Sequence, residues 1–532
     1  MKYTFDVPEA GLECPRTKPY LVYRDHVRPV IEDRRAELDA MYAPIMGRPE
    51  VDPVLLMGIT ILQMMERLPD RQAVTACLYD LRWRLALGIT STWQGFDPTT
   101  LVYFRARLGK HNQARLALDA ALAAMRKTGY LKTRGPVRID STHVLSAVAS
   151  FSRLECVRET LRLALEFLSA WGGTSPWEPW YSRYADRNPK ELRKPSVERL
   201  RTVMETAGQD ARDVLDKAQT FGELATSAEP VALLRRVFEE QFTVADGTLQ
   251  QRPTTPSGAV QNPHDPEAEW STKQSIGKAG WVGCKLQVCE TAPETIRQKG
   301  EPTEAVITAV VTQPAITSDH GSLSPVLAAH RDHGQAAPDT TFTDAGYISA
   351  PALNLADAEG YELCGPMPAP PHSGNRFGSD SFEVDLPHRG ALCPAGKANT
   401  QCSFITEAKL ARTSYFFAWA TSDCQTCPLK AHCLSKKNVL KHRTLEVGVQ
   451  HMVVQDRRNL CRTLEYQLRM RRRTGIEGTN SELKRGYGLR RSRYRGLKRT
   501  DIQMQTSAAA CNLRRWASRL CWIARRNRNN PN

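Results

Sequence analysis

Three acidic residues stand where their carboxylates could act together, although they lie far apart in the chain. Asp140 ends the alternating stretch from Pro136, Asp344 ends a similar stretch from Thr340, and Glu477 lies in a basic helical segment. Transfer of a phosphodiester needs an activated oxygen nucleophile and a stabilised leaving oxyanion, and two divalent ions about 3.5–4 Å apart serve both. Mg²⁺ requires oxygen ligands, which carboxylates supply. The three acids therefore predict a metal-dependent site for phosphodiester chemistry.

Each acid also has a purely structural interpretation. An Asp at the end of a strand commonly forms a turn or caps a helix, and Ser141 and Thr142 favour that interpretation of Asp140. On an ideal helix Arg473, Glu477 and Lys484 lie within about 40° of one another, so the cations could grip phosphates beside a metal-binding acid. The spacing of Arg473 and Glu477 equally suits an exposed i,i+4 ion pair. Glu482 is a rival third acid, but at five residues from Glu477 it points elsewhere.

The elements that position these acids follow an α/β pattern. Alternation predicts a strand that ends at Asp140, strands over 280–289 and 305–312, a strand that ends at Asp344, and a weaker strand over 361–365. A helix is expected over 323–333, and Glu477 arrives on a later helix. We therefore expect a mixed five-stranded sheet with flanking helices, interrupted by insertions, on which the three acids converge.

Composition divides the chain into four parts. Residues 1–130 form an all-helical domain for DNA binding or dimerisation. Residues 135–365 form the core, with a helical insertion at about 151–250. Residues 366–455, rich in Pro, Gly, Ser and Cys, are interpreted as an insertion that we call the cysteine module. Residues 456–532 are basic helices that complete the core.

Helix start and stop signals locate the helices of the first and last parts. Asp52-Pro53 starts a helix that runs to Glu66, Asp70 starts a second that ends near Gly88, and Asp97-Pro98 starts a third. The last part is predicted to hold a long helix from Asp456 through Arg473, a turn over 486–488, and a helix over 503–522.

The positive charge of the chain is local. The net charge is +16, and residues 457–532 hold 21 Lys and Arg against four acids, so the remainder is about neutral. Such a segment is typical of phosphate binding, although a basic C-terminal tail can also be solvated. Here cations alternate with tyrosines, so charges could meet phosphates and rings could meet bases. The candidate DNA-binding residues are Arg473, Lys484, Arg490, Arg491, Arg493, Tyr494, Arg495 and Lys498.

Nothing in the sequence favours a membrane or secreted protein. The longest apolar run, Val54 to Met65, is too short to span a bilayer, and the first residues lack the pattern of a signal peptide. We expect a cytoplasmic protein associated with DNA, whose 14 cysteines are reduced thiols or metal ligands.

Four cysteines of the cysteine module have the spacing of a zinc site. Cys424 and Cys427 form a CxxC, Cys433 follows, and Cys393 precedes them. Four thiolates can hold a structural Zn²⁺, with Cys402 or His432 as alternative ligands. One CxxC is also compatible with free thiols, and the aromatic residues nearby, Phe416, Phe417 and Trp419, fit a core.

Several segments together resemble the DDE transposases of bacterial insertion sequences, in particular the eleven-eighty-two group. The acid-bearing segments are Ile139-Asp140-Ser141-Thr142-His143, Thr343-Asp344-Ala345-Gly346-Tyr347, and Arg473-Thr474-Gly475-Ile476-Glu477-Gly478 followed by Lys484. The opening Gly47-Arg48-Pro49, followed by Asp52-Pro53-Val54-Leu55-Leu56, resembles their N-terminal helical domain. Asp265-Pro266-Glu267-Ala268, Lys273 and Trp281-Val282-Gly283-Cys284-Lys285 resemble their second-strand segment. The resemblance thus covers most of the chain.

The resemblance implies an RNase H-like core in which Asp140, Asp344 and Glu477 bind Mg²⁺ or Mn²⁺. It also implies cleavage at transposon ends and strand transfer into target DNA by a homodimer on DNA. The family signature has Tyr, two residues, Arg, three residues, Glu, six residues and Lys. Arg473, Glu477 and Lys484 fit it, but Met470 occupies the Tyr position, where Tyr466 could substitute.

Two other functions are compatible with the same residues. A metal-dependent nuclease on the same fold would hydrolyse DNA without joining it to a target. A DNA-binding regulator derived from a transposase would use the basic segment without catalysis. Joined donor–target products distinguish a transposase from the first, and strand cleavage distinguishes it from the second.

Overall fold

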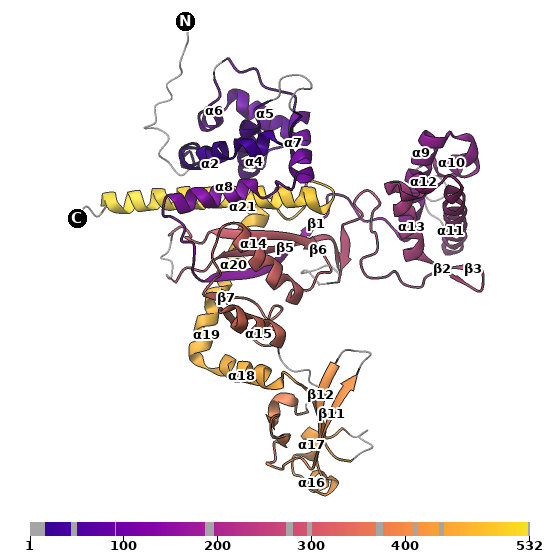
Figure 1. The fold of residues 1–532 in the computed structure, drawn as a ribbon, viewed down its shortest axis with the longest axis vertical. Helices are drawn as coiled ribbons and strands as arrows, with labels where there is room; N and C mark the ends of the chain where they lie inside the picture. The colour runs from indigo at the N-terminus through magenta and orange to yellow at the C-terminus, as the bar shows by residue number, and fades with distance from the viewer. Residues whose placement is uncertain are drawn as a thin grey trace.

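The computed structural model describes residues 16–43, 51–90, 92–186, 196–272, 280–294, 300–368, 376–407, 412–435 and 441–529. The Gly47-Arg48-Pro49 segment and Lys273 lie outside these residues. A mixed sheet occupies the centre of the molecule, with helices on both sides (Figure 1). Two further groups of elements project from it in different directions, one helical and one formed by the cysteine module (Figure 1).

Six strands of the central sheet lie within the described residues. Strand β5 pairs antiparallel with β1, β6 and β4, and β1 pairs in parallel with β7, which pairs in parallel with β8. The strands are β1 (Val137–Leu145), β4 (Glu269–Ser271), β5 (Trp281–Thr291), β6 (Ile307–Pro314), β7 (Thr340–Phe342) and β8 (Glu362–Cys364). The expectation of five strands was wrong, because it missed the short strand β4. Three residues carry too few positions for an alternating pattern to be recognised.

Strand β1 also differs from its prediction. It was expected to end at Asp140, but it continues to Leu145 because β5 pairs with it along its whole length, from Val137↔Thr291 to Leu145↔Gly283. Ser141 and Thr142 are therefore strand residues and do not form a turn. Asp140 lies in the interior of a strand that is hydrogen-bonded on both edges.

The two faces of the sheet are covered by different helices. On one face Val137, Ile139 and Cys289 pack against α14 (Leu323–Asp332) and α15 (Ala350–Glu359). On the other face Val144 and Val288 belong to a core that includes the long C-terminal helix α21 (Leu497–Asn529). The predicted helix over 323–333 is confirmed. Alternate residues of β1 and β5 are thus buried on opposite sides, as a sheet between two helical layers requires.

The N-terminal helices pack on the far side of α21, which lies between them and the sheet (Figure 1). They are α1 (Lys18–Val22), the π-helix η2 (Tyr23–Val27), α2 (Arg28–Asp33), α3 (Arg35–Asp39), α4 (Pro53–Glu66), α5 (Asp70–Tyr79), α6 (Leu81–Leu87), α7 (Thr99–Lys110) and α8 (Leu116–Lys127). Their buried side chains and those of α21 form one continuous core.

The start signals locate some of these helices accurately. Helix α4 is confirmed, with the Asp52 side chain accepting from the Val54 amide. The single helix expected from Asp70 to Gly88 is instead two, because the Asp80 carboxylate accepts from the Arg82 amide and starts α6. An internal cap therefore divides a stretch that appeared continuous in the hydrophobic pattern.

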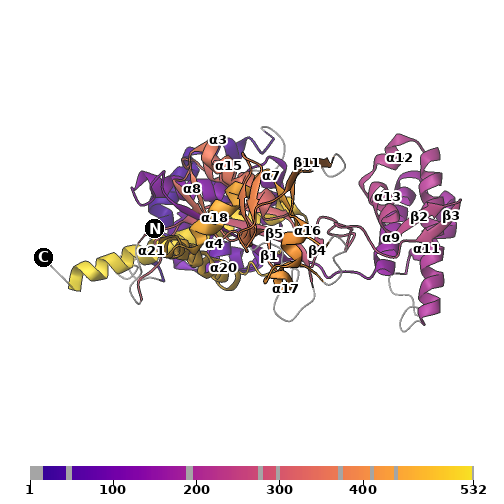
Figure 2. The same ribbon diagram turned by 90° about the horizontal axis from the view of Figure 1, so that it is seen from below.

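The segment between β1 and β5 forms a helical unit that stands to one side of the sheet (Figure 2). It has its own core, centred on Trp177 and Leu161. Its elements are α9 (Arg153–Gly172), η3 (Ser175–Trp177), α10 (Glu178–Tyr184), α11 (Val197–Thr220), α12 (Glu223–Ser227), α13 (Glu229–Gln241), β2 (Phe242–Ala245) and β3 (Thr248–Gln251). The predicted helical character of this insertion is confirmed.

The cysteine module is a small β unit around Phe417 and Trp419. Its elements are η6 (Ser379–Ser381), β9 (Glu383–Asp385), β10 (Gly390–Leu392), β11 (Gln401–Glu407), β12 (Arg412–Ala418), α16 (Thr421–Gln425), α17 (Lys430–Cys433) and β13 (Thr444–Gly448). Burial of Phe417 and Trp419 confirms that these aromatic residues serve a core.

The chain returns to the sheet through short helices. They are α18 (His451–Arg462), α19 (Leu464–Met470), the 3₁₀ turn η8 (Arg471–Thr474) and α20 (Gly475–Gly486). The one long helix predicted from Asp456 is thus wrong, because Thr463 adopts an extended conformation and its hydroxyl accepts from the Tyr466 amide. The turn over 486–488 is confirmed, with Gly488 at φ +73°.

A close backbone approach between β1 and β5 gives a test of this fold. A Cβ at Gly283 would lie 2.0 Å from the carbonyl oxygen of Val144. We expect Gly283→Ala to destabilise the protein by about 1–3 kcal/mol or more, because two backbones would have to separate. Gly478→Ala is the matched control: its Cβ would meet nothing within 4 Å, so it should be neutral or slightly stabilising. Thermal unfolding of the two variants measures the difference, and equal melting temperatures would contradict the pairing.

Candidate active site

The parallel pairing of β1 with β7 brings Asp140 and Asp344 level with each other. Val137 pairs with Thr341 and Arg138 with Phe342, so the same register two residues on places Asp140 opposite Asp344. The Thr343 amide donates to the Cys364 carbonyl, which keeps β7 aligned beyond its last paired residue. Neighbouring strands lie about 5 Å apart. Asp140 thus lies two residues past the last position at which β1 pairs with β7, and Asp344 lies two residues past the end of this parallel neighbour.

Asp140 is bonded to helix α20. Its Oδ1 accepts from the Ser141 amide at 2.8 Å, and its Oδ2 accepts from the Asn480 side-chain amide at 3.0 Å. Asn480 is three residues after Glu477 and hence on the same face of α20. The contact therefore turns the Glu477 face of the helix toward β1.

One surface cavity confirms that arrangement. From α20 it is lined by Glu477, Asn480, Ser481 and Lys484, which follow the i, i+3, i+4, i+7 spacing of one helix face. Asp140, Ser141 and Thr142 line it from β1, and Arg485 and Arg490 complete it. The structure thus brings two of the predicted acids, Asp140 and Glu477, to one cavity, whereas Asp344 is not among its lining residues.

Asp344 has a second carboxylate beside it that the sequence did not indicate. Its Oδ1 accepts from the Gly346 amide at 2.9 Å, and a Cβ at Gly346 would lie 3.1 Å from Asp344 and 3.2 Å from Asp319. Lys285 of β5 lies 3.1 Å from the Asp319 carboxylate and compensates its charge. A lysine within a buried strand was the only sequence signal of this pair, since a buried cation requires a partner.

The pKa of the Tyr347 phenol is affected by the negative charges of the nearby carboxylates. Its pKa is raised well above the usual range, first by burial and then by Asp319, Asp140 and Asp344. The phenol stays protonated and donates to Gln287. All three carboxylates therefore act on one buried hydroxyl.

Cations balance the acids on the α20 side. Burial and the neighbouring Arg490 lower the pKa of Lys484, while Asp140 acts in the opposite direction. A half-buried ammonium group beside the cavity is poorly hydrated and therefore suited to a phosphate oxygen. Arg473, in η8, lies 3.4 Å from Glu477, whose side chain is 63% exposed. This is the exposed ion pair that the sequence also allowed.

No closed metal site is formed by these side chains. Within the described ranges, no three His, Cys, Asp or Glu side chains are arranged to hold one metal ion. Glu477 pairs with Arg473 and is largely exposed, so as the side chains stand it forms no metal-binding group with Asp140 or Asp344.

Two alternatives from the sequence lie elsewhere. Glu482 pairs with Arg515 of α21 at 2.8 Å, on a different face of α20 from the cavity. Tyr466 is buried, and its hydroxyl accepts from the Gly365 amide at 3.0 Å. Tyr466 therefore secures the end of β8 and does not reach the cavity, so the idea that it replaces the signature Tyr is wrong.

The candidate DNA-binding residues divide into two groups. Arg490, Arg491, Arg495 and Lys498 are exposed. Arg493 instead donates to the Leu68 carbonyl at 2.8 Å, and the Arg105 guanidinium covers the Tyr494 ring at 5.0 Å. The sequence suggested that this ring could stack on a base, but both residues attach the segment to the N-terminal helices.

The four predicted zinc ligands lie around one small cavity of the cysteine module. Cys393, Cys424, Cys427 and Cys433 all line it. The Lys397 amide points at the Cys393 sulfur at 3.4 Å, and the Arg443 amide points at the Cys424 sulfur at 3.3 Å. Cys402 and His432 are not among the lining residues. None of the described cysteines forms a disulfide.

Two family models match the chain. The first, described as Transposase DDE domain, covers residues 392–517, and the second, described as Transposase domain (DUF772), covers residues 17–107. Both matched segments are transposase segments, and the longer one is that of a DDE transposase. The first match runs from the cysteine module through α20, which carries Glu477, into α21, while Asp140 and Asp344 lie outside both matches. No curated protein and no solved structure was found to match this transposase. Over the described ranges it has no helix with the length and apolar character of a membrane span.

Proposed function

We propose that this transposase cleaves DNA at transposon ends and transfers the strands into target DNA, with Asp140, Asp344 and Glu477 as its catalytic acids. The observation that carries the proposal is the junction of β1, β7 and α20. Asp140 and Asp344 each lie two residues beyond the last parallel pair of β1 and β7, and the Asn480–Asp140 bond turns the Glu477 face of α20 toward β1. The membership of the eleven-eighty-two group is part of the same proposal.

The order of the strands supports an RNase H-like core. The path β6-β5-β1-β7-β8 has an antiparallel half and a parallel half that meet at β1. Asp140 is on the central strand, Asp344 follows its parallel neighbour, and Glu477 is on a helix that returns late in the chain. The sequence resemblance implied an RNase H-like core that carries these three acids.

The donor set fits Mg²⁺ or Mn²⁺. Three carboxylates from three elements supply the hard oxygen ligands that these ions prefer. When bound, the ions would stabilise negative charge on the attacking and leaving oxygens. Glu477 has to leave Arg473 to join the other two acids, and an exposed ion pair opposes this only weakly.

The other residues of the cavity have supporting tasks. Asn480 and the Ser141 amide fix the two oxygens of Asp140, and the Gly346 amide fixes one oxygen of Asp344. Lys484 and Arg490 present positive charge to a phosphate at the same cavity. The exposed Arg491, Arg495 and Lys498 extend this charge along the bound DNA. Since transposition acts on two ends, we propose a homodimer on DNA.

Replacement of the acids tests the proposal. Asp140→Asn, Asp344→Asn and Glu477→Gln should each abolish strand cleavage and joining, while DNA affinity stays close to that of the parent. Removal of a negative charge from a basic surface does not weaken phosphate attraction. Glu465→Gln, at an exposed acid on α19, is the control and should retain activity.

The products of this assay distinguish the three functions. A labelled donor end joined to target DNA supports a transposase, cleavage without joining supports a nuclease, and binding without cleavage by the parent protein supports a regulator. Cleavage that survives Asp140→Asn would refute the assignment of the acids.

The contribution of the exposed cations is measured by salt dependence. Replacing Arg490, Arg495 and Lys498 with Gln should reduce the slope of log affinity against log salt by about 0.9 per lost phosphate contact. The matched control replaces Arg525, Arg526 and Arg528, which are equally exposed at the end of α21. Equal slopes for both triple variants would show that charge alone, and not this surface, determines binding.

We propose that the cysteine module holds a structural Zn²⁺ through Cys393, Cys424, Cys427 and Cys433. Four thiols around one cavity fit the thiolate preference of zinc, and two backbone amides already point at sulfurs. The side chains must rotate inward to bind, since they are not arranged for a metal ion as they stand. Zinc would tie together the segments around Cys393, Cys424 and Cys433, beside the apolar core of the module.

Metal content tests the zinc site. The purified protein should contain about one zinc per chain, and Cys424→Ser should remove it and lower the thermal stability of the module. Cys402→Ser is the matched control and should keep the zinc, because Cys402 does not line the cavity. A protein without zinc, measured by elemental analysis, would leave the four residues as reduced thiols.

A further inference from the structure

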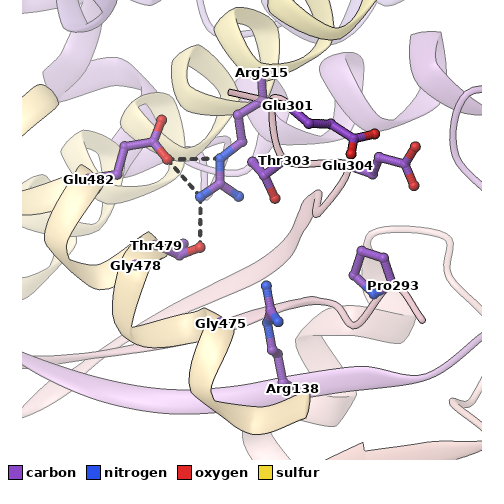
Figure 3. A pocket seen from close by; sticks show the side chains of 10 residues that line it. All are labelled: Arg138, Pro293, Glu301, Thr303, Glu304, Gly475, Gly478, Thr479, Glu482 and Arg515. Atoms are coloured by element: carbon purple, nitrogen blue, oxygen red, sulfur yellow. Dashed lines mark hydrogen bonds and ion pairs between the residues drawn. The ribbon is translucent and has the colours of Figure 1, made fainter. Parts of the chain in front are cut away.

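A carboxylate buried beneath α20 joins four elements of the core. Glu290 of β5 is fully buried. Its Oε1 accepts from Arg138 of β1 at 2.6 Å, and its Oε2 accepts from Arg515 of α21 at 3.0 Å and from the Thr479 hydroxyl of α20 at 2.6 Å. We call these four residues the Glu290 cluster. Three of them, Arg138, Thr479 and Arg515, line the pocket drawn in Figure 3, where Arg515 and Thr479 meet.

The two positive charges of the cluster are balanced by Glu290 together with Glu482. Arg515 also binds Glu482 through two nitrogen atoms, so two guanidinium groups face two carboxylates (Figure 3). Burying such charges costs several kcal/mol per ion, and only good geometry with satisfied hydrogen bonds compensates for it. A helix held by this network has one favourable position, because a small shift would leave a buried charge unpaired. Apolar packing alone would tolerate such a shift.

The cluster is adjacent to the proposed catalytic residues on two elements. Arg138 precedes Asp140 by two positions, so both lie on the same side of β1. Thr479 lies between Glu477 and Asn480 on α20. The cluster therefore fixes the two elements whose separation determines how far Glu477 is from Asp140.

The start of α20 is held by the same arginine. Arg138 donates to the Arg472 carbonyl at 3.1 Å, just before the helix begins. A Cβ at Gly475 would lie 1.9 Å from the Arg138 guanidinium, so any larger residue would displace this arginine from its hydrogen bonds. Figure 3 shows Arg138 rising from its strand toward that turn of the helix.

We propose that the Glu290 cluster is a positioning device that locks α20 against β1 and so sets the place of Glu477 relative to Asp140. Its members are positioning residues and touch neither DNA nor metal. The proposal rests on the proposed function for its catalytic consequence, but the locking of α20 is a property of the protein alone.

The sharpest test is Thr479→Val, which keeps the shape of the side chain and removes the hydroxyl through which α20 bonds to both Arg515 and Glu290. Amide hydrogen exchange of α20 should become faster in this variant, while α21 is unchanged. Mn²⁺ affinity, measured by calorimetry, should fall by roughly 10-fold, as is usual when support of a metal ligand is lost. Cleavage should recover at saturating Mn²⁺, and Thr479→Ser should restore both properties.

The control is Thr308→Val. Thr308 is also fully buried and donates to the Cys289 carbonyl on β5, but it does not contact α20. It should lower stability without changing exchange in α20 or the affinity for Mn²⁺. Unchanged exchange of α20 in Thr479→Val, or an equal effect of Thr308→Val, would overturn the proposal. Mn²⁺ affinity that is unaffected by Asp140→Asn would instead refute the proposed function. The locking of α20 would then be judged by hydrogen exchange alone.

Discussion

Hydrogen bonding along both edges of β1 is the constraint on which the rest of the structure depends. On one edge β5 runs antiparallel to it over its full length, and on the other β7 runs parallel. A parallel neighbour requires a long crossover connection, whereas an antiparallel neighbour does not. β1 is therefore the strand at which sequence-distant segments meet, and an acid in its interior faces residues from several parts of the chain.

Helix α21 gives this sheet its second constraint. It packs against β6 on one side and against α4 and α8 on the other, so N-terminal and C-terminal residues share one core. The asparagine Asn512 binds both the amide and the carbonyl of Ile307, which ties the helix to the sheet by direct hydrogen bonds. Buried polar pairs of this kind fix one alignment, because any other would leave them unsatisfied. The N-terminal helices thus complete the protein interior around α21.

The two projecting units leave this arrangement intact because each buries its own apolar residues. The helical unit between β1 and β5 packs around Trp177, and the cysteine module packs around Phe417. Their attachment points lie at strand ends and loops, where a long insertion costs little entropy. The central sheet can therefore form from strands that are separated by about a hundred residues.

Sequence alone determined those features that depend on short-range patterns. Alternation located β5, β6 and β8, the Asp52-Pro53 pair located the start of α4, and the charge count located the basic segment. The same patterns identified the three acids and the four cysteines of the proposed sites, and the family matches agree with the transposase resemblance. Such signals are carried by residues within one or two turns of each other, so no partner is needed to recognise them.

Only the tertiary structure determined the strand ends, helix boundaries and buried charges, because these depend on contacts between segments that are distant in the sequence. β1 extends past Asp140 because β5 pairs with it, and helices divide at Asp80 and Thr463 because each residue caps the following helix. Arg493 and Tyr494 belong to the same basic, tyrosine-containing stretch as their exposed neighbours. Their contacts with the N-terminal helices nevertheless turn them inward. Asp319 and Glu290 could not be identified from their own neighbours in the sequence, because the cations that allow their burial come from distant segments. Only the lysine within the buried strand β5 indicated that an acid had to lie near it. A charge is identified as structural or functional only by the group that faces it.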